Sequence, residues 1–204
     1  MIAVILAVAQ IIATVIGRTG LGGKLSGLIA TMGESTLLIT LILGMVVTII
    51  LGMGVPTVAA YMLSASVIAS AFAAIGLPVL ATHMFILYYA ILSGITPPVA
   101  LAAYVASGIA KAHWFKTALA GCKIGLSGFL IPFMFIYRPA LLGQGSVIEV
   151  SLAVITAIFG IVALGGATIG YLVVHTTFVW RIILLISALL LMTPRLWGNI
   201  IGLC

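Results

Sequence analysis

The chain has 204 residues, of which 65% are hydrophobic and 5% are charged, with eight basic residues against two acidic ones. A soluble domain carries roughly a quarter charged residues, and one with so few charges would expose the large apolar patches that soluble monomers avoid. The composition therefore excludes a water-soluble domain and indicates an integral membrane protein. The basic residues are too scattered for nucleic-acid binding, so their excess is interpreted as membrane topology.

Apolar residues are spread along almost the whole chain, so several segments are expected to enter the lipid. In lipid, only helices and closed barrels satisfy every backbone group internally. Barrel strands alternate apolar and polar residues, whereas runs such as Leu37–Leu43 and Ile182–Met192 do not alternate. We therefore expect an all-α, polytopic helical membrane protein.

The first 35 residues are the least regular part of the sequence. Ile2–Ile16 is short for a span, and the stretch lacks the positive start of a signal peptide. Arg18 and Lys24 lie in a glycine-rich segment expected at the membrane surface. Leu25–Met32 is a short amphipathic segment that ends near Glu34.

Two apolar segments flank a break made of glycine and proline. Thr36–Leu51 runs into Gly52-Met53-Gly54-Val55-Pro56-Thr57, and Val58–Ile75 follows. Proline removes a backbone donor and disfavours helix in the residue before it, while glycine accepts non-helical geometry. One interpretation is a tight turn at the membrane surface. The other is a re-entrant helical hairpin with its tip inside the membrane, which the absence of charge from residue 36 to residue 78 favours.

A second break of the same kind follows. His83–Ser93 is apolar and aromatic, Gly94-Ile95-Thr96-Pro97-Pro98 interrupts it, and Val99–Ala110 resumes. Tandem prolines are expected to leave backbone carbonyls without partners, and these, with the hydroxyls of Ser93 and Thr96, are oxygen ligands that a hard cation accepts. The alternative is a proline-kinked span whose hydroxyls bond back to the helix. Two discontinuous helices in one chain favour a transporter's midplane site.

The remaining sequence predicts a basic loop and three more spans. Lys111, Lys116 and Lys123, with His113 and Trp114, indicate a cytoplasmic loop with an aromatic anchor. Pro132 is expected to kink the span that follows, and Arg181 to extend toward the membrane surface. The three spans are Ile124–Tyr137 (starting nearer Thr117), Val150–Val174 and Phe178–Met192.

The sequence lacks the groups that an enzyme needs. It contains no aspartate, and Glu34 and Glu149 lie beside breaks or loops, so a proton relay of buried carboxylates is not expected. Cys122 and Cys204 have no metal-ligand spacing. His83 enters the second broken segment, and we weigh a functional role for it against that of a packed or interfacial histidine.

The stretches GMGVPTVAAYMLSAS and HMFILYYAILSGITPPVALAAYVASGIA, followed by FLIPFMFIYRPALLGQG, resemble a known family. They are similar to the large membrane subunit of tripartite ATP-independent periplasmic (TRAP) transporters, and most of all to permeases in which the two membrane subunits are fused. The resemblance covers about residues 1–146, and residues 147–204 resemble the C-terminal transmembrane extension of such permeases much more weakly.

The resemblance implies the second inverted repeat of an elevator-type transporter, with a hairpin at about 36–77 and a broken helix at about 83–110. It places the hairpin tip and the broken helix near a cation site and a substrate cavity. The residues assigned to the cation site are Gly52, Gly54, Ser93, Gly94, Thr96 and Pro97, and those assigned to the substrate cavity are Pro56, Thr57 and Pro98.

The resemblance also implies a function and partners. Such permeases use a sodium or proton gradient to take up carboxylates that a periplasmic substrate-binding protein delivers, in the inner membrane of a bacterium or archaeon. The lack of buried carboxylates in this part of the permease favours sodium over protons as the coupling ion, with both left open, and no other cofactor is expected. The first repeat has no counterpart in the matched segments, so we expect a fragment or one half of a permease, with an N-terminal half or a small membrane subunit as partner. A channel subunit and a structural or inactive subunit are the alternatives.

Overall fold

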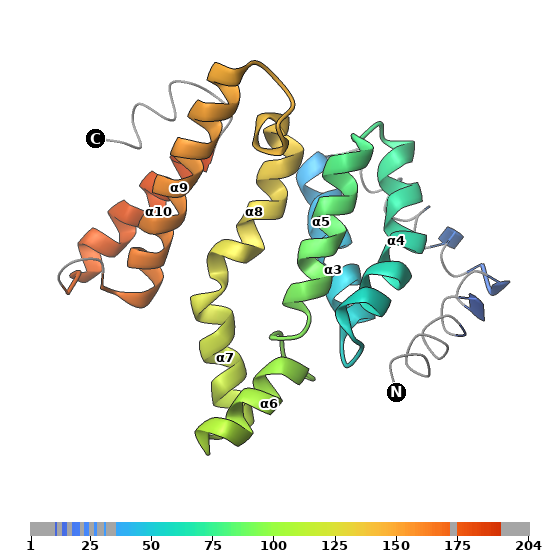
Figure 1. Ribbon diagram of the computed structural model, residues 1–204, viewed down its shortest axis with the longest axis horizontal. Helices are drawn as coiled ribbons and strands as arrows, with labels where there is room; N and C mark the ends of the chain where they lie inside the picture. Colours follow the sequence, from blue (N-terminus) through green and yellow to red (C-terminus); the bar gives the residue numbers. More distant parts are fainter. Residues whose placement is uncertain are drawn as a thin grey trace. The chain divides into compact units, whose positions relative to one another are not determined.

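The computed structural model of the chain describes residues 36–171 and 175–192, together with Ile11, Thr14, Val15, Arg18–Gly20, Gly23, Lys24, Gly27 and Thr31. The segments expected at Ile2–Ile16 and Leu25–Met32 thus fall largely outside the described residues. The described part is helical, with no strand in it beyond an isolated bridge between Tyr171 and His175. The prediction of an all-α protein is confirmed (Figure 1). The elements are α3 (Leu37–Gly52), α4 (Thr57–Ala74), α5 (Val79–Leu92), α6 (Leu101–Ala110), α7 (Trp114–Ile124), α8 (Leu126–Tyr137), the 3-10 helix η1 (Pro139–Leu142), α9 (Val147–Ile169) and α10 (Phe178–Met192).

Two of the described helices, α4 and α9, are long and apolar enough to cross a membrane on their own. Helices α7 and α8 reach that length together, as a pair bent by 43°. The bend lies at Gly125, whose backbone has φ −79° and ψ 7°, and α8 continues through Pro132. The span is therefore broken at Gly125, seven residues before the predicted kink.

The chain divides into two compact units, residues 1–121 and 122–204. In the first unit α3, α4 and α5 pack against one another. The aromatic rings of Phe72 and Phe85 meet edge to face with centroids 5.3 Å apart, and those of Phe85 and Tyr89 with centroids 4.7 Å apart. All three side chains are fully buried, so this aromatic cluster holds α5 against α4.

Gly44 allows α3 to approach this aromatic cluster closely. A Cβ atom at Gly44 would lie 2.6 Å from Cζ of Phe72 and 3.5 Å from Cε1 of Phe85. Any larger residue would force α3 and the ring of Phe72 apart, because a packed interior has little room to give. The three helices therefore pack as a unit that depends on a glycine in the middle of α3.

In the second unit α9 and α10 pack along each other. Two arginines donate hydrogen bonds to carbonyls in the last turns of these helices, one arginine to each helix. Arg181 donates from Nε to the carbonyl of Ala167 at 2.8 Å and from Nη2 to that of Thr168 at 3.1 Å. Arg138 donates from Nη1 to the carbonyl of Leu191 at 3.3 Å. A helix leaves its last carbonyls unpaired and carries partial negative charge there. The interpretation of Arg181 as a side chain extending to the membrane surface missed this role.

Helix α9 begins three residues before the predicted span because Ser146 and Glu149 form a capping box. The hydroxyl of Ser146 accepts the backbone N–H of Glu149 at 3.3 Å, and Oε2 of Glu149 accepts that of Ser146 at 2.9 Å. This reciprocal pair satisfies two donors at the helix start. Glu149 thus lies in the first turn of α9 and not in a loop.

The predicted basic loop at 111–123 is also largely helical. Helix α7 covers Trp114–Ile124, and the turn before it contains Lys111 and His113. Lys116 and Lys123 are two helical turns apart, so both fit one face of a helix. Reading the lysines as marks of a loop was wrong for this part of the segment.

Candidate functional site

The tip of the α3–α4 hairpin is a four-residue turn. The N–H of Val55 donates to the carbonyl of Gly52 at 3.3 Å, Met53 has φ −63° and ψ 122°, and Gly54 has φ +74°. These are the angles of a type II turn, which needs positive φ at its third residue and therefore favours glycine. Pro56 has no N–H and a fixed φ, so it suits the position before the first residue of α4, Thr57.

The break between α5 and α6 covers Ser93 to Ala100, and its Pro97–Pro98 peptide bond is cis. In a continuous helix the N–H groups of residues 97 and 98 would bond to the carbonyls of Ser93 and Gly94, and two prolines cannot supply them. The N–H of Thr96 donates to the Ser93 carbonyl at 3.3 Å instead, and that of Ala102 donates to the Gly94 carbonyl at 2.9 Å. The expectation that the prolines leave carbonyls without partners is therefore wrong for these two.

The hairpin tip and the break are in direct contact. A Cβ atom at Gly52 would overlap Oγ of Ser93 and would lie 2.8 Å from Cβ of Ser93. At Gly54 such an atom would lie 3.3 Å from Cγ1 of Val99. Two glycines of the tip thus lie against two residues of the break, so the two irregular segments that the sequence singled out form one region of the first unit.

The two hydroxyls of the break both bond to the preceding helix. Oγ of buried Ser93 donates to the carbonyl of Ala90 at 2.8 Å, and Oγ1 of half-buried Thr96 donates to that of Leu92 at 2.8 Å. This is the back-bonding that the proline-kinked alternative describes. A hydroxyl that donates its proton keeps two lone pairs, so both oxygens remain able to accept from a donor or a cation.

The other predicted site residues lie around this contact with different exposure. Gly94 is partly buried beside Ala102, at the carbonyl of Ile91, and Pro97 is also partly buried. The three residues assigned to a substrate cavity are all exposed, namely Pro56, Thr57 and Pro98. Oxygen atoms are the main polar groups of the region, and among the described residues no group of three or more histidine, cysteine or acidic side chains is placed to hold a metal ion. The donor set therefore suits a hard monovalent cation better than a transition metal.

His83 has a partner that the sequence did not indicate. The hydroxyl of Tyr61 in α4 and Nδ1 of His83 in α5 are 2.9 Å apart, and both side chains are partly buried. The bond links the second arm of the hairpin to the helix that leads into the break. Tyr61 was not singled out from the sequence, since no local pattern relates residues 22 positions apart on different helices.

Comparison with known proteins matches residues 1–150 to one family, described as the tripartite ATP-independent periplasmic transporter, DctM component. The chain belongs to this family. The TRAP resemblance of the hairpin and broken-helix motifs is thereby confirmed, and the matched segment contains the tip, the break and the basic turn after α6. Comparisons with curated proteins and with solved structures give no match.

Membership in the TRAP family settles the class of activity. The chain is a multi-pass membrane protein of a secondary transport system, and the family is one of transporters and not of enzymes. Since the system is tripartite, this component works with others. The contact between the hairpin tip and the break therefore lies in the segment that defines a transport component.

Proposed function

We propose that this chain takes part in the cation-coupled uptake of a small organic acid, with sodium as the coupling ion. The observation that carries the proposal is the contact of Gly52 with Ser93, which joins two broken helical segments. Transporters bind coupling ions where discontinuous helices meet. Gly52, Gly54, Ser93, Gly94, Thr96 and Pro97 would form this cation site.

The proposed chemistry is charge stabilisation by neutral oxygen atoms. A sodium ion would be held by the hydroxyls of Ser93 and Thr96 and by carbonyl oxygens of the tip and the break, and it would supply positive charge next to an anionic substrate. Pro56, Thr57 and Pro98, which are exposed beside the contact, would border the substrate cavity. Because neutral oxygens leave the ion's charge uncompensated, an organic anion is the substrate class that best complements this site.

The proposed setting follows from the family. The substrate would be delivered by a periplasmic binding protein, and a small membrane subunit would assemble with this component in the inner membrane of a bacterium or archaeon. A channel would conduct its substrate without a coupling-ion gradient or a binding protein. If the chain were a structural subunit, mutating the break would leave the ion dependence of uptake unchanged.

The test is uptake by the complete reconstituted transporter as a function of sodium concentration. Thr96→Val keeps the shape of the side chain and removes one oxygen, and Ser93→Ala removes the hydroxyl at the second position. We expect each variant to raise the sodium concentration needed for half-maximal uptake by about tenfold, the equivalent of one hydrogen-bond-sized contribution of roughly 1.4 kcal/mol.

Matched controls come from the same unit. Thr48 bonds back to Gly44 at 2.7 Å and Ser66 to Leu63 at 2.7 Å, so both share the back-bonding of Thr96 and Ser93 without lying in the break. Thr48→Val and Ser66→Ala should leave the sodium dependence unchanged. Unaltered sodium dependence in Thr96→Val and Ser93→Ala would refute the cation site, and substrate uptake without a coupling-ion gradient would favour a channel.

A further inference from the structure

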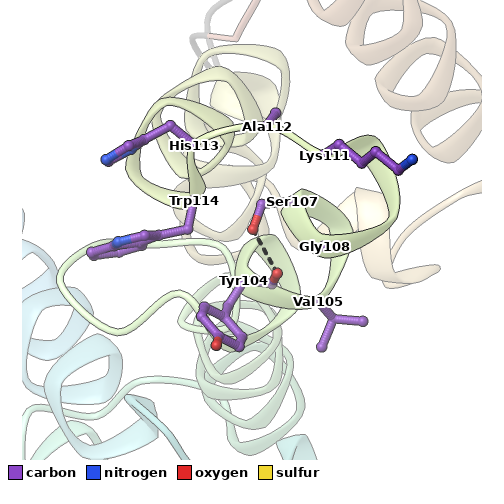
Figure 2. A pocket seen from close by; sticks show the side chains of 8 residues that line it. All are labelled: Tyr104, Val105, Ser107, Gly108, Lys111, Ala112, His113 and Trp114. Atoms are coloured by element: carbon purple, nitrogen blue, oxygen red, sulfur yellow. Dashed lines mark hydrogen bonds between the residues drawn. The ribbon is translucent and has the colours of Figure 1, made fainter.

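A hollow lies on the surface where α6 turns into α7, in the basic segment that the transport site does not use. Its volume is about 560 Å³, within the roughly 300–1,000 Å³ of ligand pockets. Figure 2 shows Lys111 at one side and the rings of His113, Trp114 and Tyr104 at the other, with Ser107 between them. The rest of the lining is Val105, Gly108 and Ala112.

The local backbone fixes a lysine at the edge of this hollow. The N–H groups of Lys111 and Ala112 both donate to the carbonyl of Ser107 and close the end of α6. Lys111 has φ +49°, in the left-handed region where a helix end usually has glycine. A side chain in this conformation is strained because its Cβ approaches the following carbonyl oxygen, so the fold places a positively charged side chain here at an energetic cost.

The polar groups of the hollow are complementary to an anion that also carries hydroxyls. The ammonium group of Lys111 is exposed at the rim, and residues 101–124 contain no acidic side chain. The hydroxyl of Ser107 donates to the carbonyl of Tyr104 at 2.7 Å, so its oxygen has only acceptor capacity left. A phosphate group would pair with the lysine, and a ligand hydroxyl would donate to Ser107.

The surroundings are those of a membrane surface. His113 and Trp114 are stacked, with ring planes 18° apart and centroids separated by 6.5 Å, and amphipathic rings of this kind concentrate at the lipid headgroups. Large apolar side chains beside the hollow are exposed, as lipid-facing residues are, namely Tyr104 at 62%, Val105 at 58% and Ile109 at 83%. A soluble anion has no apolar part to cover these exposed side chains, whereas the acyl chains of a lipid would cover them.

We propose that the hollow between α6 and α7 binds the phosphoglycerol headgroup of an anionic phospholipid, with Lys111 pairing with the phosphate and Ser107 accepting from a glycerol hydroxyl. Basic pockets beside membrane helices hold anionic headgroups in this way. The site anchors the turn that follows the broken helix to one face of the bilayer. It is separate from the cation site and does not depend on transport.

The test uses the fluorescence of Trp114 in the full chain. The sequence has three tryptophans, so Trp180→Phe and Trp197→Phe leave Trp114 as the reporter. The protein is placed in nanodiscs of phosphatidylcholine containing either brominated phosphatidylglycerol or brominated phosphatidylcholine, which quench nearby tryptophan. We expect the relative binding constant to favour phosphatidylglycerol by about fivefold, the effect of one lysine at an anionic surface.

Lys111→Asn removes the charge with a residue that tolerates the left-handed conformation, and it should bring the preference close to one. Lys111→Arg should restore it. Lys116→Gln is the matched control, since Lys116 is exposed two residues beyond the lining residue Trp114, and it should keep the preference. The Trp114 emission maximum and circular dichroism show whether each variant keeps its fold.

Three results would overturn the proposal: no preference in the parent protein, an equal loss in Lys116→Gln, or reversal of the quenching by excess glycerol phosphate. The second would indicate diffuse electrostatic attraction by the lysines. The third would indicate a site for a soluble phosphate compound.

Discussion

At the scale of single residues, the contact between the hairpin tip and the break depends on the absence of a side chain at Gly52. Without a Cβ atom, the end of α3 can lie against Ser93. Ala60 is also close, because its Cβ is 3.2 Å from the position that a Cβ of Gly52 would take. Glycine in a helix costs about 1 kcal/mol relative to alanine, so this position gives up helix stability in return for contact. The contact places the backbone of Gly52 beside the hydroxyl of Ser93.

Gly52→Ala is expected to destabilise the protein by about 1–3 kcal/mol, because overpacking a closed contact displaces its neighbours. Gly165→Ala is the control, since a Cβ atom at Gly165 in α9 would meet nothing within 4 Å, and it should be neutral or stabilising. Thermal unfolding in detergent measures both. A melting temperature for Gly52→Ala equal to that of the parent would show that the tip can move away from Ser93 at no cost.

Ser93→Gly provides a further check on the same contact, because it removes both atoms that a new Cβ would meet. The double variant Gly52→Ala/Ser93→Gly should recover stability relative to the sum of the two single changes. If the two changes in the free energy of unfolding were strictly additive, the destabilisation by Gly52→Ala would come from another contact, such as the one with Ala60.

Residue types and local order predicted which residues would break the helices, but not what those residues would contact. Gly54, Pro97 and Pro98 predict irregular backbone because their own geometry favours it. The pairing of Gly52 with Ser93 depends on the packing of α3 against α5, and the bonds from Arg181 to the end of α9 depend on how α9 and α10 meet. Contacts between helices join side chains far apart in sequence, so local patterns in the sequence do not reveal them.

At the scale of elements, the hairpin is the best-predicted part of the fold. Helices α3 and α4 begin and end within one residue of the expected Thr36–Leu51 and Val58–Ile75. Glycine and proline mark the turn between the two helices and the turn after α4. Most of α7 falls within the span predicted to start near Thr117. Its first turn falls in the predicted basic loop, although the spacing of Lys116 and Lys123 fits a helical face. The capping box of α9 was missed despite a recognisable sequence, Ser146 followed by Glu149 at the third position.

The hairpin interpretation predicts that its tip can be reached by water although apolar helices flank it. Thr57 is exposed at the start of α4. Thr57→Cys, in a background without Cys122 and Cys204, should react with a membrane-impermeant thiol reagent applied from the outer side when the transporter faces outward. A hydrophilic path to the tip is what lets an irregular segment exist at membrane depth.

The control for this reaction is Ile186→Cys, because Ile186 is half exposed in α10, an apolar helix that we expect to face lipid. The two cysteines should differ in labelling rate by at least about tenfold, since a thiol in hydrocarbon is largely protonated and out of reach of a charged reagent. Equal protection of both would contradict a re-entrant tip.

At the scale of the whole molecule, the few charges of the chain define its orientation in the membrane. Of the eight basic residues, three are gathered within 13 residues, at Lys111, Lys116 and Lys123. The first two lie on the turn before α7 and in its first turn. Basic residues in short segments beside spans are retained on the cytoplasmic side, and the lipid site proposed next to Lys111 would face the same leaflet.

The turn between α6 and α7 is therefore predicted to lie in the cytoplasm, with the turn between α4 and α5 on the opposite side. A reporter that is active only in the periplasm should be silent when fused after Lys116 and active when fused after Gly76. A reporter active only in the cytoplasm should give the reverse pattern at the same two points, which controls for expression. The broken helix formed by α5 and α6 would then cross the membrane once, because its two ends lie on opposite sides. Periplasmic activity after Lys116 would show that every later helix has the opposite orientation. It would also mean that the three lysines cross the membrane despite the preference of basic segments for the cytoplasmic side.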